Sequence, residues 1–213
     1  MRKFLLLLML FTAFAAAQEG SVAQNVNEPE SLNKSGFYFD LTLGGAMRHL
    51  EAKHKAYVDQ GRTHYDYLGY TGRGGLVSAG IGGIIRGVVA IYGNLKLEIT
   101  KGENSGYKKD TRPTGSFFFS NGPGVTIFPF FHSTGSIRNL YLSSTGNITF
   151  GGGGDIGFFG LNTTFETGFL WNTSDRYYSG FSIGADIVST AGLNSYYKEK
   201  GYSIWVGFKL IRK

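Results

Sequence analysis

Histidine and charged side chains gather in one polar segment, residues 49–69, where metal binding would be the most obvious chemistry. Three of the four histidines lie there, His49, His54 and His64, and a neutral imidazole is a common ligand of zinc and copper. The gaps between them, four residues and then nine, match no compact ligand motif. We therefore expect no metal site and no cofactor.

Two other strings resemble pieces of a catalytic site. His132-Ser133 places a base beside a nucleophile, but hydrolysis also requires an orienting group, and no carboxylate lies nearby in the sequence. The run Gly151 to Gly154 has the glycine content of a phosphate-binding loop, yet it lacks the Lys-Ser/Thr that follows in such loops. We expect the protein not to be an enzyme.

Between residues 36 and 211 the chain repeatedly alternates apolar with polar residues, which is the period of a β-strand. In the clearest segment, 89–100, Leu95 belongs to the apolar phase and Lys96 to the polar phase. Proline cannot donate to a ladder, so we expect a bulge or a break at Pro123. Eight segments qualify as strands, the last two weaker than the others: 37–44, 77–82, 89–100, 161–171, 181–187, 202–210, 116–129 and 139–150.

Long and short connections alternate along the predicted strands. Tight turns are expected at 85–87 and 172–176, while 130–138 is somewhat longer than a tight turn. The long polar connections are 49–69, 102–115, 151–157 and 189–200. This rhythm predicts antiparallel hairpins without a domain boundary after residue 35.

The first residues read as a secretory signal. In residues 1–17, Arg2 and Lys3 precede an apolar stretch that ends in three small residues. We expect residues 18–35 to be a flexible periplasmic lead-in and residues 36–213 to form the folded domain. Removing the signal lowers the net charge from +6 to +4, and the remaining basic residues are scattered, so we expect no nucleic-acid partner.

Composition excludes several classes of protein. The chain of 213 residues has 33 glycines, 15% aromatic residues and no cysteine, so neither disorder nor a disulfide scaffold fits it. Only 17% of the residues are charged, against about 25% in an ordinary soluble domain.

Alternation alone does not say which face meets water, because a soluble barrel and a membrane barrel share the same period. The predicted strands approach the 9–11 residues that cross a bilayer at a tilt, and their polar faces are poor in lysine and glutamate. These features favour an all-β, antiparallel up-and-down transmembrane barrel of about eight strands with its apolar face toward lipid.

The signal, the eight amphipathic strands and the aromatic last strand resemble the small eight-stranded outer-membrane barrels of the OmpA and OmpX type. The last strand, with Glu199, Gly201, Ile204 and Val206 followed in phase by Phe208, is similar to the carboxy-terminal signal that the barrel-assembly machinery reads. Members of that family commonly end in phenylalanine, whereas this chain continues through five further residues. The resemblance implies a bacterial outer-membrane location.

The polar phase of the strands would then line the barrel interior. Eight strands leave an interior just wide enough for side chains to fill, and buried charges persist when they are paired. We expect a lumen network of ion pairs and hydrogen bonds formed by Asp40, Tyr92, Lys96, Glu98, Glu166, Asp186 and Lys209.

Basic residues in the first long connection would lie at the cell surface. We expect contacts to lipopolysaccharide phosphates, or to an unidentified surface partner, from Arg48, Lys53, Lys55 and Arg62. A solvated charged face is the alternative reading of the same residues.

The role expected from these features is structural or interactive, with a plugged lumen and basic extracellular loops. One alternative is a narrow pore for solutes or ions. Another is a secreted soluble ligand-binding barrel, which would place Phe37, Phe39, Leu95 and Leu97 inside.

Overall fold

The computed structural model describes residues 35–59, 62–106, 113–153, 156–174, 176–192 and 197–212. The expected signal peptide (1–17) and all of the lead-in (18–35) except Ser35 lie outside the described residues.

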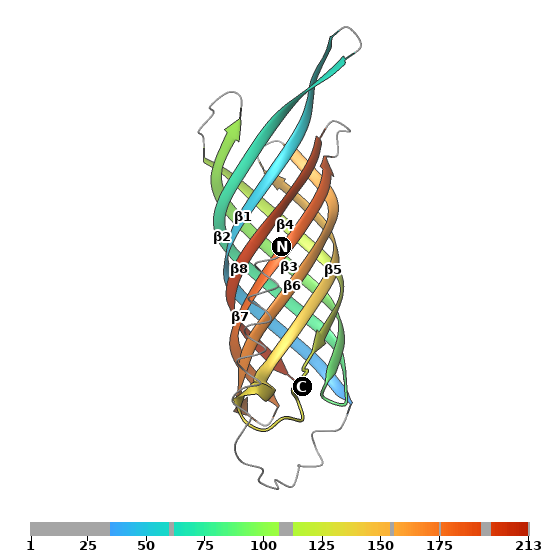
Figure 1. Cartoon of the computed structure of the whole chain (residues 1–213), viewed down its shortest axis with the longest axis vertical. Coiled ribbons are helices and arrows are strands. Elements are labelled where there is room, and N and C mark those ends of the chain that lie inside the picture. Colours follow the sequence, from blue (N-terminus) through green and yellow to red (C-terminus); the bar gives the residue numbers. More distant parts are fainter. Residues whose placement is uncertain are drawn as a thin grey trace.

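Eight antiparallel strands form a closed barrel in which each strand pairs with its neighbours in sequence and β8 returns to β1 (Figure 1). This confirms the predicted fold class and strand number. Apart from the strands, the described residues contain one 3₁₀ helix, η2 (Ser136–Asn139), and no helix among them is long and apolar enough to cross a membrane. The strands are β1 (Gly36–Asp59), β2 (Arg62–Ile85), β3 (Val89–Gly106), β4 (Pro113–Ile127), β5 (Leu140–Gly153), β6 (Ile156–Ser174), β7 (Tyr177–Gly192) and β8 (Tyr197–Arg212).

The two ends of the barrel differ. The hairpin end carries the β1–β2, β3–β4, β5–β6 and β7–β8 connections, and the turn end carries the other three together with the start of β1 and the end of β8. The expected tight turn at 85–87 lies at the turn end, where Arg86 and Gly87 both have positive φ. There the Val88 amide donates to the Ile85 carbonyl at 3.0 Å.

The long polar connection predicted at 49–69 is wrong, because β1 and β2 continue through it to Asp59 and Arg62. β1 pairs with β8 as far as His54, and β2 pairs with β3 from Leu68 onward. Beyond those points the two strands pair only with each other in the described ladders, and they project from the hairpin end (Figure 1). A hairpin ladder needs only backbone groups, so it continues where the apolar alternation stops.

Pro123 neither bulges nor breaks β4, contrary to the expectation. The ladder with β3 passes through the pair Gly93–Pro123. On the other side, the pairs Asn121–Ile148 and Gly124–Thr145 keep one register around an unpaired step. The missing donor therefore affects the pairing with β5 alone.

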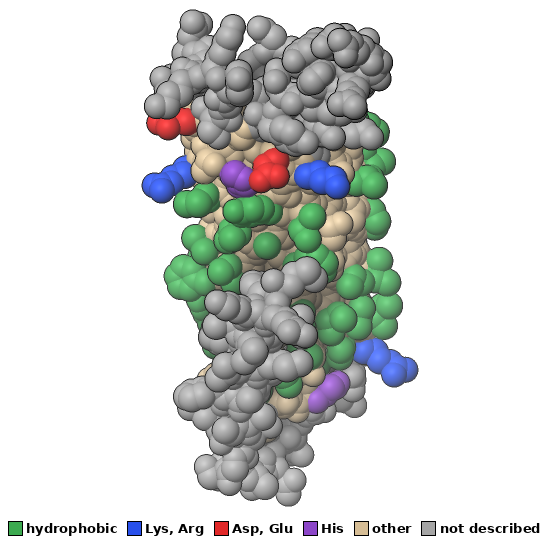
Figure 2. Space-filling view, turned by 45° about the horizontal axis from the view of Figure 1, so that its top comes forward, with side chains coloured by type: hydrophobic (Ala, Val, Ile, Leu, Met, Phe, Trp, Pro, Cys, Tyr) green, Lys and Arg blue, Asp and Glu red, His purple; other side chains and the backbone are tan. Residues whose placement is uncertain are grey.

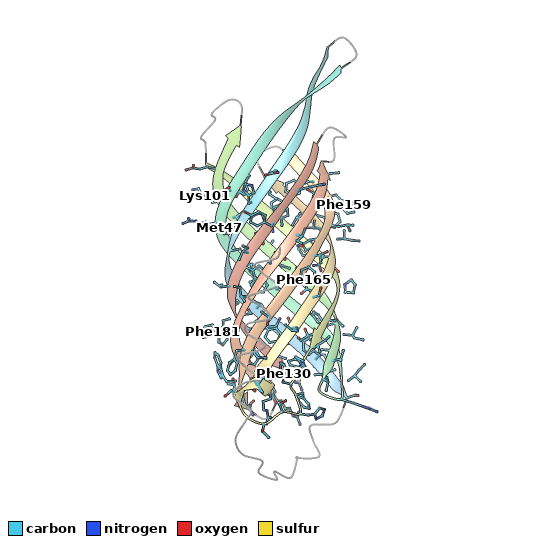
Figure 3. All side chains as sticks on the ribbon, in the orientation of Figure 1. Met47, Lys101, Phe130, Phe159, Phe165 and Phe181 are labelled. Atoms are coloured by element: carbon cyan, nitrogen blue, oxygen red, sulfur yellow. The ribbon has the colours of Figure 1, made fainter. Side chains whose placement is uncertain are left out.

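The apolar phase faces outward. Phe37 is 50% exposed, Leu95 48% and Leu97 39%, so the inward placement that the soluble alternative gave to these side chains is wrong. Figure 2 shows outward apolar side chains as a band across the visible face of the barrel, and Phe159, Phe165 and Phe181 point away from the wall at successive levels (Figure 3). Polar residues of the opposite phase are buried in the lumen.

Two adjacent glycines on β2 provide a matched test of this packing. A Cβ on Gly74 would collide with the Ile99 carbonyl oxygen and with Thr100 Cα, whereas a Cβ on Gly75 would lie no closer than 3.7 Å to the Gly44 carbonyl oxygen. We expect Gly74→Ala to lower the free energy of unfolding by about 1–3 kcal/mol, as overpacking does. Urea titration followed by tryptophan fluorescence measures the change.

Gly75→Ala is the control, with an expected change of less than about 1 kcal/mol. Equal losses of stability in the two variants would contradict the assignment of inward and outward faces on β2.

Candidate functional site in the barrel lumen

The structure places all seven residues of the expected lumen network inside the barrel, at alternate positions of β1, β3, β6, β7 and β8. Each strand delivers its charged side chain inward because side chains two residues apart share a face. Six of the seven are buried and Glu166 is nearly so. They fall into three levels along the barrel.

The level closest to the turn end is built around Lys209. Its Nζ donates to both carboxylate oxygens of Glu166 at 3.0 Å and lies 3.6 Å from Asp40 Oδ2. Tyr38 Oη donates to Asp40 at 2.8 Å, and Tyr141 Oη donates to Glu166 at 2.5 Å. One lysine therefore holds two carboxylates, each of which also accepts a tyrosine hydroxyl.

The middle level is an ion pair between Lys96 on β3 and Asp186 on β7. Thr164 Oγ1 donates to the second oxygen of Asp186 at 2.6 Å, and Lys96 Nζ lies 5.1 Å from the ring centroid of Trp205. A side chain on Gly184 would collide with that ring, so the glycine makes room for the tryptophan.

The level closest to the hairpin end contains Arg48, which corrects the expectation that this residue lies at the surface. Arg48 is 0% exposed. Its Nε donates to Glu98 Oε1 at 2.6 Å, and Ser203 Oγ donates to the same oxygen at 3.1 Å. The guanidinium carbon lies 3.5 Å from the ring centroid of Phe118.

Arg48 was misplaced because the predicted strand ended at residue 44. Arg48 has the same parity as Asp40, so extending the alternation by four residues places its side chain in the lumen. Of the other three expected surface cations, Lys55 and Arg62 lie where β1 and β2 project from the hairpin end, and Lys53 lies on β1 where it still pairs with β8.

The Arg48–Glu98 contact is single rather than bidentate. Arg48 Nη1 and Nη2 and Glu98 Oε2 are buried without a hydrogen-bond partner among the described residues. Trp205 Nε1, beside Lys96 at the middle level, is likewise buried without a hydrogen-bond partner among the described residues. A buried donor without a partner costs free energy, so the level of Arg48 is polar and incompletely satisfied.

Apolar residues fill the lumen at both ends of the charged levels. Leu50, Tyr70, Phe118, Phe158 and Val188 form a cluster near the hairpin end. At the turn end, a second cluster contains Tyr38, Ile84, Ala90, Tyr92, Phe128, Tyr141, Leu170 and Ile211. The charged levels of the described lumen thus lie between two apolar clusters.

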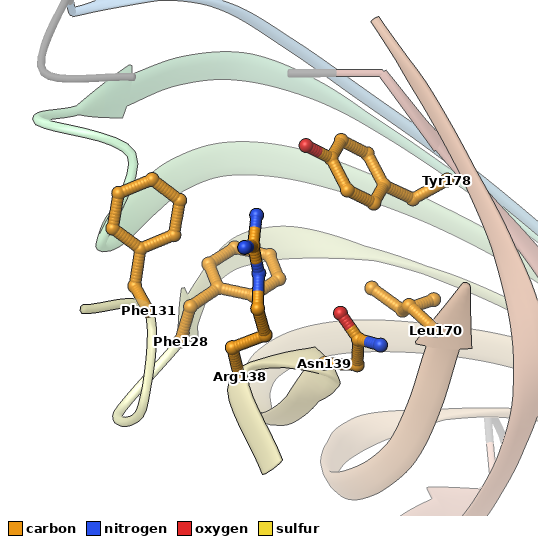
Figure 4. A pocket seen from close by; sticks show the side chains of 6 residues that line it. All are labelled: Phe128, Phe131, Arg138, Asn139, Leu170 and Tyr178. Carbon is orange, nitrogen blue, oxygen red and sulfur yellow. The ribbon is translucent and has the colours of Figure 1, made fainter. Parts of the chain in front are cut away.

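Phe128, which the sequence reading assigned to the weak strand 116–129, lies past the end of β4 and closes the turn end. It is 0% exposed, and its amide donates to the Val88 carbonyl oxygen at 2.8 Å. A small pocket beside it, shown in Figure 4, is lined by Phe128, Phe131, Arg138, Asn139, Leu170 and Tyr178. Only the apolar character of Phe128 was visible in the sequence, and its inward direction depends on the fold.

None of the described residues form a group of three or more His, Asp or Glu side chains that would hold a metal ion. His49 lies on the outer wall of the barrel, where its Nδ1 is 2.9 Å from Thr71 Oγ1 and its Nε2 is 3.7 Å from Glu51. The side chains of His54 and His64 lie outside the described residues.

The buried position of Arg48 gives a testable difference in stability. We expect Arg48→Met to lower the free energy of unfolding by about 3–5 kcal/mol, because it leaves Glu98 charged and unpaired in the lumen. Adding Glu98→Gln removes that charge, so the double variant should recover much of the loss. Urea titrations of the two single variants and the double variant measure the coupling.

Lys200→Met is the control, since Lys200 is exposed on the outer wall and an exposed charge contributes about 0–1 kcal/mol. If Arg48→Met lowers the free energy of unfolding no more than the control does, the buried position of Arg48 in the lumen is contradicted.

No protein-family model matches this sequence, and neither does any curated protein. Among solved structures, the chain is similar to Neisserial surface protein A, with 14% identity, a TM-score of 0.48, and coverage of 84% of this chain and 99% of that one. It is also similar to the outer membrane protein OprG from Pseudomonas aeruginosa, with 8% identity, a TM-score of 0.46, and coverage of 81% of this chain and 95% of that one. A third similar structure is the outer membrane protein AlkL, with 7% identity, a TM-score of 0.48, and coverage of 91% of this chain and 97% of that one. The architecture of this chain rests on its own strand pairing: it is an eight-stranded, up-and-down antiparallel β-barrel.

Proposed function

We propose that this chain is an integral protein of a bacterial outer membrane, with a structural or surface-interaction role and no catalytic activity. The observation that carries the proposal is the reversed polarity of the barrel. Large apolar side chains face outward, and three cations and four carboxylates lie inside. A protein surrounded by water would expose those charges and bury the apolar residues.

The closed sheet supports placement in lipid. Within a bilayer every backbone N–H and C=O group needs a partner in the protein, and a barrel without an edge supplies one. In this chain β8 pairs with β1 from Phe39–Arg212 to His54–Tyr197, so the ring closes with a long ladder.

Aromatic residues at the turn end support the same placement. Trp171, Phe181 and Phe208 face outward in mutual contact, with ring centroids 5.5–6.3 Å apart, and Tyr177, four residues before Phe181 on β7, is also exposed. Aromatic girdles of this kind mark the boundaries of the apolar band in membrane barrels. The turn end would lie at the periplasmic boundary, because short connections face the periplasm in such barrels.

A filled lumen argues against transport. The ion pairs and the two end clusters occupy the interior, and an eight-stranded barrel has room for little else. The polar character of the charged levels is nevertheless what a narrow pore would require, so the pore remains the second candidate.

A charge on the outer wall tests the lipid-facing assignment. Leu95 is midway along β3 and faces outward. We expect Leu95→Arg to lower the free energy of unfolding of the barrel in lipid vesicles by about 2–4 kcal/mol, the cost of an arginine near the bilayer midplane. The readout is the fraction of protein that migrates as a compact band on a gel unless it is boiled, measured across a urea series.

Ile85→Arg is the matched control, because Ile85 also faces outward but lies at the strand end next to the turn, where the cost is about 0–1 kcal/mol. A wild-type protein that is soluble without detergent and shows no shift on boiling would contradict the proposal. So would equal effects of the two substitutions.

Electrical recording separates the structural role from the pore. We expect the wild-type protein in planar bilayers to give no steady conductance, because Lys96 reaches Asp186 on the opposite wall and Lys209 joins Glu166 to Asp40 within the lumen. A steady conductance that is abolished by Glu166→Gln would establish the narrow pore instead. Tyr202→Phe, an outward-facing change, controls for nonspecific leakage.

A further inference from the structure

Two cations on the outer wall face each other across neighbouring strands. Arg73 on β2 and Lys101 on β3 are direct partners in the ladder, and both are exposed. Lys101 points away from the barrel (Figure 3). Like charges directly opposite each other on a sheet are destabilising, so the pair calls for a counter-charge.

The neighbouring wall supplies little negative charge. Along the same row, Arg73 has Met47 on its other side and Lys101 has Gly115. The closest acidic residue in sequence is Glu103, two positions farther toward the hairpin end, and no ion pair among the described residues joins it to either cation.

Other described charged residues at this edge of the apolar band have a neighbour of opposite charge. Lys200 on β8 lies directly opposite Glu51 on β1, and His49 also lies 3.7 Å from Glu51. Figure 2 shows cationic, acidic and histidine side chains along one edge of the apolar band. Among the pairs at that edge whose side chains the structure describes, Lys200–Glu51 is of opposite charge and Arg73–Lys101 is of like charge.

On the turn-end side of the cation pair, the outer wall is apolar and carries few protruding side chains. Toward the turn end the next outward residues are Gly75 on β2 and Ile99 on β3, which are ladder partners, and Gly45 lies opposite Gly75. The two glycines leave bare backbone beside Ile99, which is 57% exposed. An anion held by Arg73 and Lys101 would therefore have its remaining bulk against an apolar surface.

We propose that Arg73 and Lys101 bind the headgroup phosphate of a membrane lipid whose acyl chains lie on the apolar wall beneath them. The arginine offers a fork of donors that matches two phosphate oxygens, and the lysine adds a point charge. The apolar wall favours a lipid over a free anion. This site rests on the proposed membrane placement, and it lies on the barrel wall rather than on the basic hairpin that the sequence indicated.

The test uses the full barrel refolded in detergent micelles, with diphosphoryl lipid A as the probe and native mass spectrometry to count bound lipid. Replacing both cations, Arg73→Gln with Lys101→Gln, should weaken lipid binding about tenfold or more, because two charge-assisted contacts are lost. Lys101→Gln alone should produce a smaller loss. The control, Arg86→Gln with Arg176→Gln, removes two exposed cations from the turn end and should bind like the wild type.

Three results would overturn the lipid site: unchanged binding by the Arg73/Lys101 variant, an equal loss in the turn-end control, or displacement of the lipid by millimolar inorganic phosphate. Every variant is first checked for the boiling-dependent gel shift. If the wild type lacks that shift, the membrane placement fails and the lipid site fails with it. If the shift is present and lipid binding is insensitive to the cations, only the lipid site fails.

Discussion

Closure of the sheet between β8 and β1 is the constraint on which the rest of the molecule depends. Once the ring is closed, each strand has one face toward the surroundings and one toward an interior that eight strands keep narrow. The apolar phase occupies the outside, so every charge of the other phase must find a partner within that interior. Lumen composition is therefore a consequence of closure and of the period of two, rather than an independent feature.

The buried ion pairs act as braces across the ring. Lys96 on β3 reaches Asp186 on β7, four strands away and therefore on the opposite wall. Arg48–Glu98 and Lys209–Glu166 each bridge one intervening strand. A buried pair adds little net stability compared with a well-packed apolar pair, but breaking one is costly. Pairs that join distant strands therefore penalise a slipped register, since a shift of one residue would turn the charges toward the wall.

Much of this arrangement was predictable because the signal is local. Alternation identified the strands and their two faces, while the strand length and the scarcity of lysine and glutamate on the polar faces indicated that the apolar face is outward and that the seven polar residues lie in the lumen. It failed over residues 52–68, where the sequence no longer alternates between apolar and polar residues while the backbone ladder between β1 and β2 continues. Arg48 lies just before that segment, and because the predicted strand ended at residue 44, Arg48 was wrongly assigned to the surface. The buried position of Phe128 depends on contacts between segments far apart in sequence, such as the hydrogen bond from its amide to the Val88 carbonyl oxygen, and no local pattern encodes them.

The distribution of charge connects the interior to the outer wall. Among the described residues, each of the four lumen carboxylates contacts a lumen cation, Arg48, Lys96 or Lys209, and these ion pairs lie on the inner face of the barrel, away from the outer wall. Arg73 and Lys101 share a row with methionine and glycine, not with an acid. Among the described residues no ion pair joins either cation to an acid, and the proposed lipid site supplies their counter-charge from outside the chain. At the edge of an apolar band, the anion that can reach both the cations and the wall below them is one carried by a lipid.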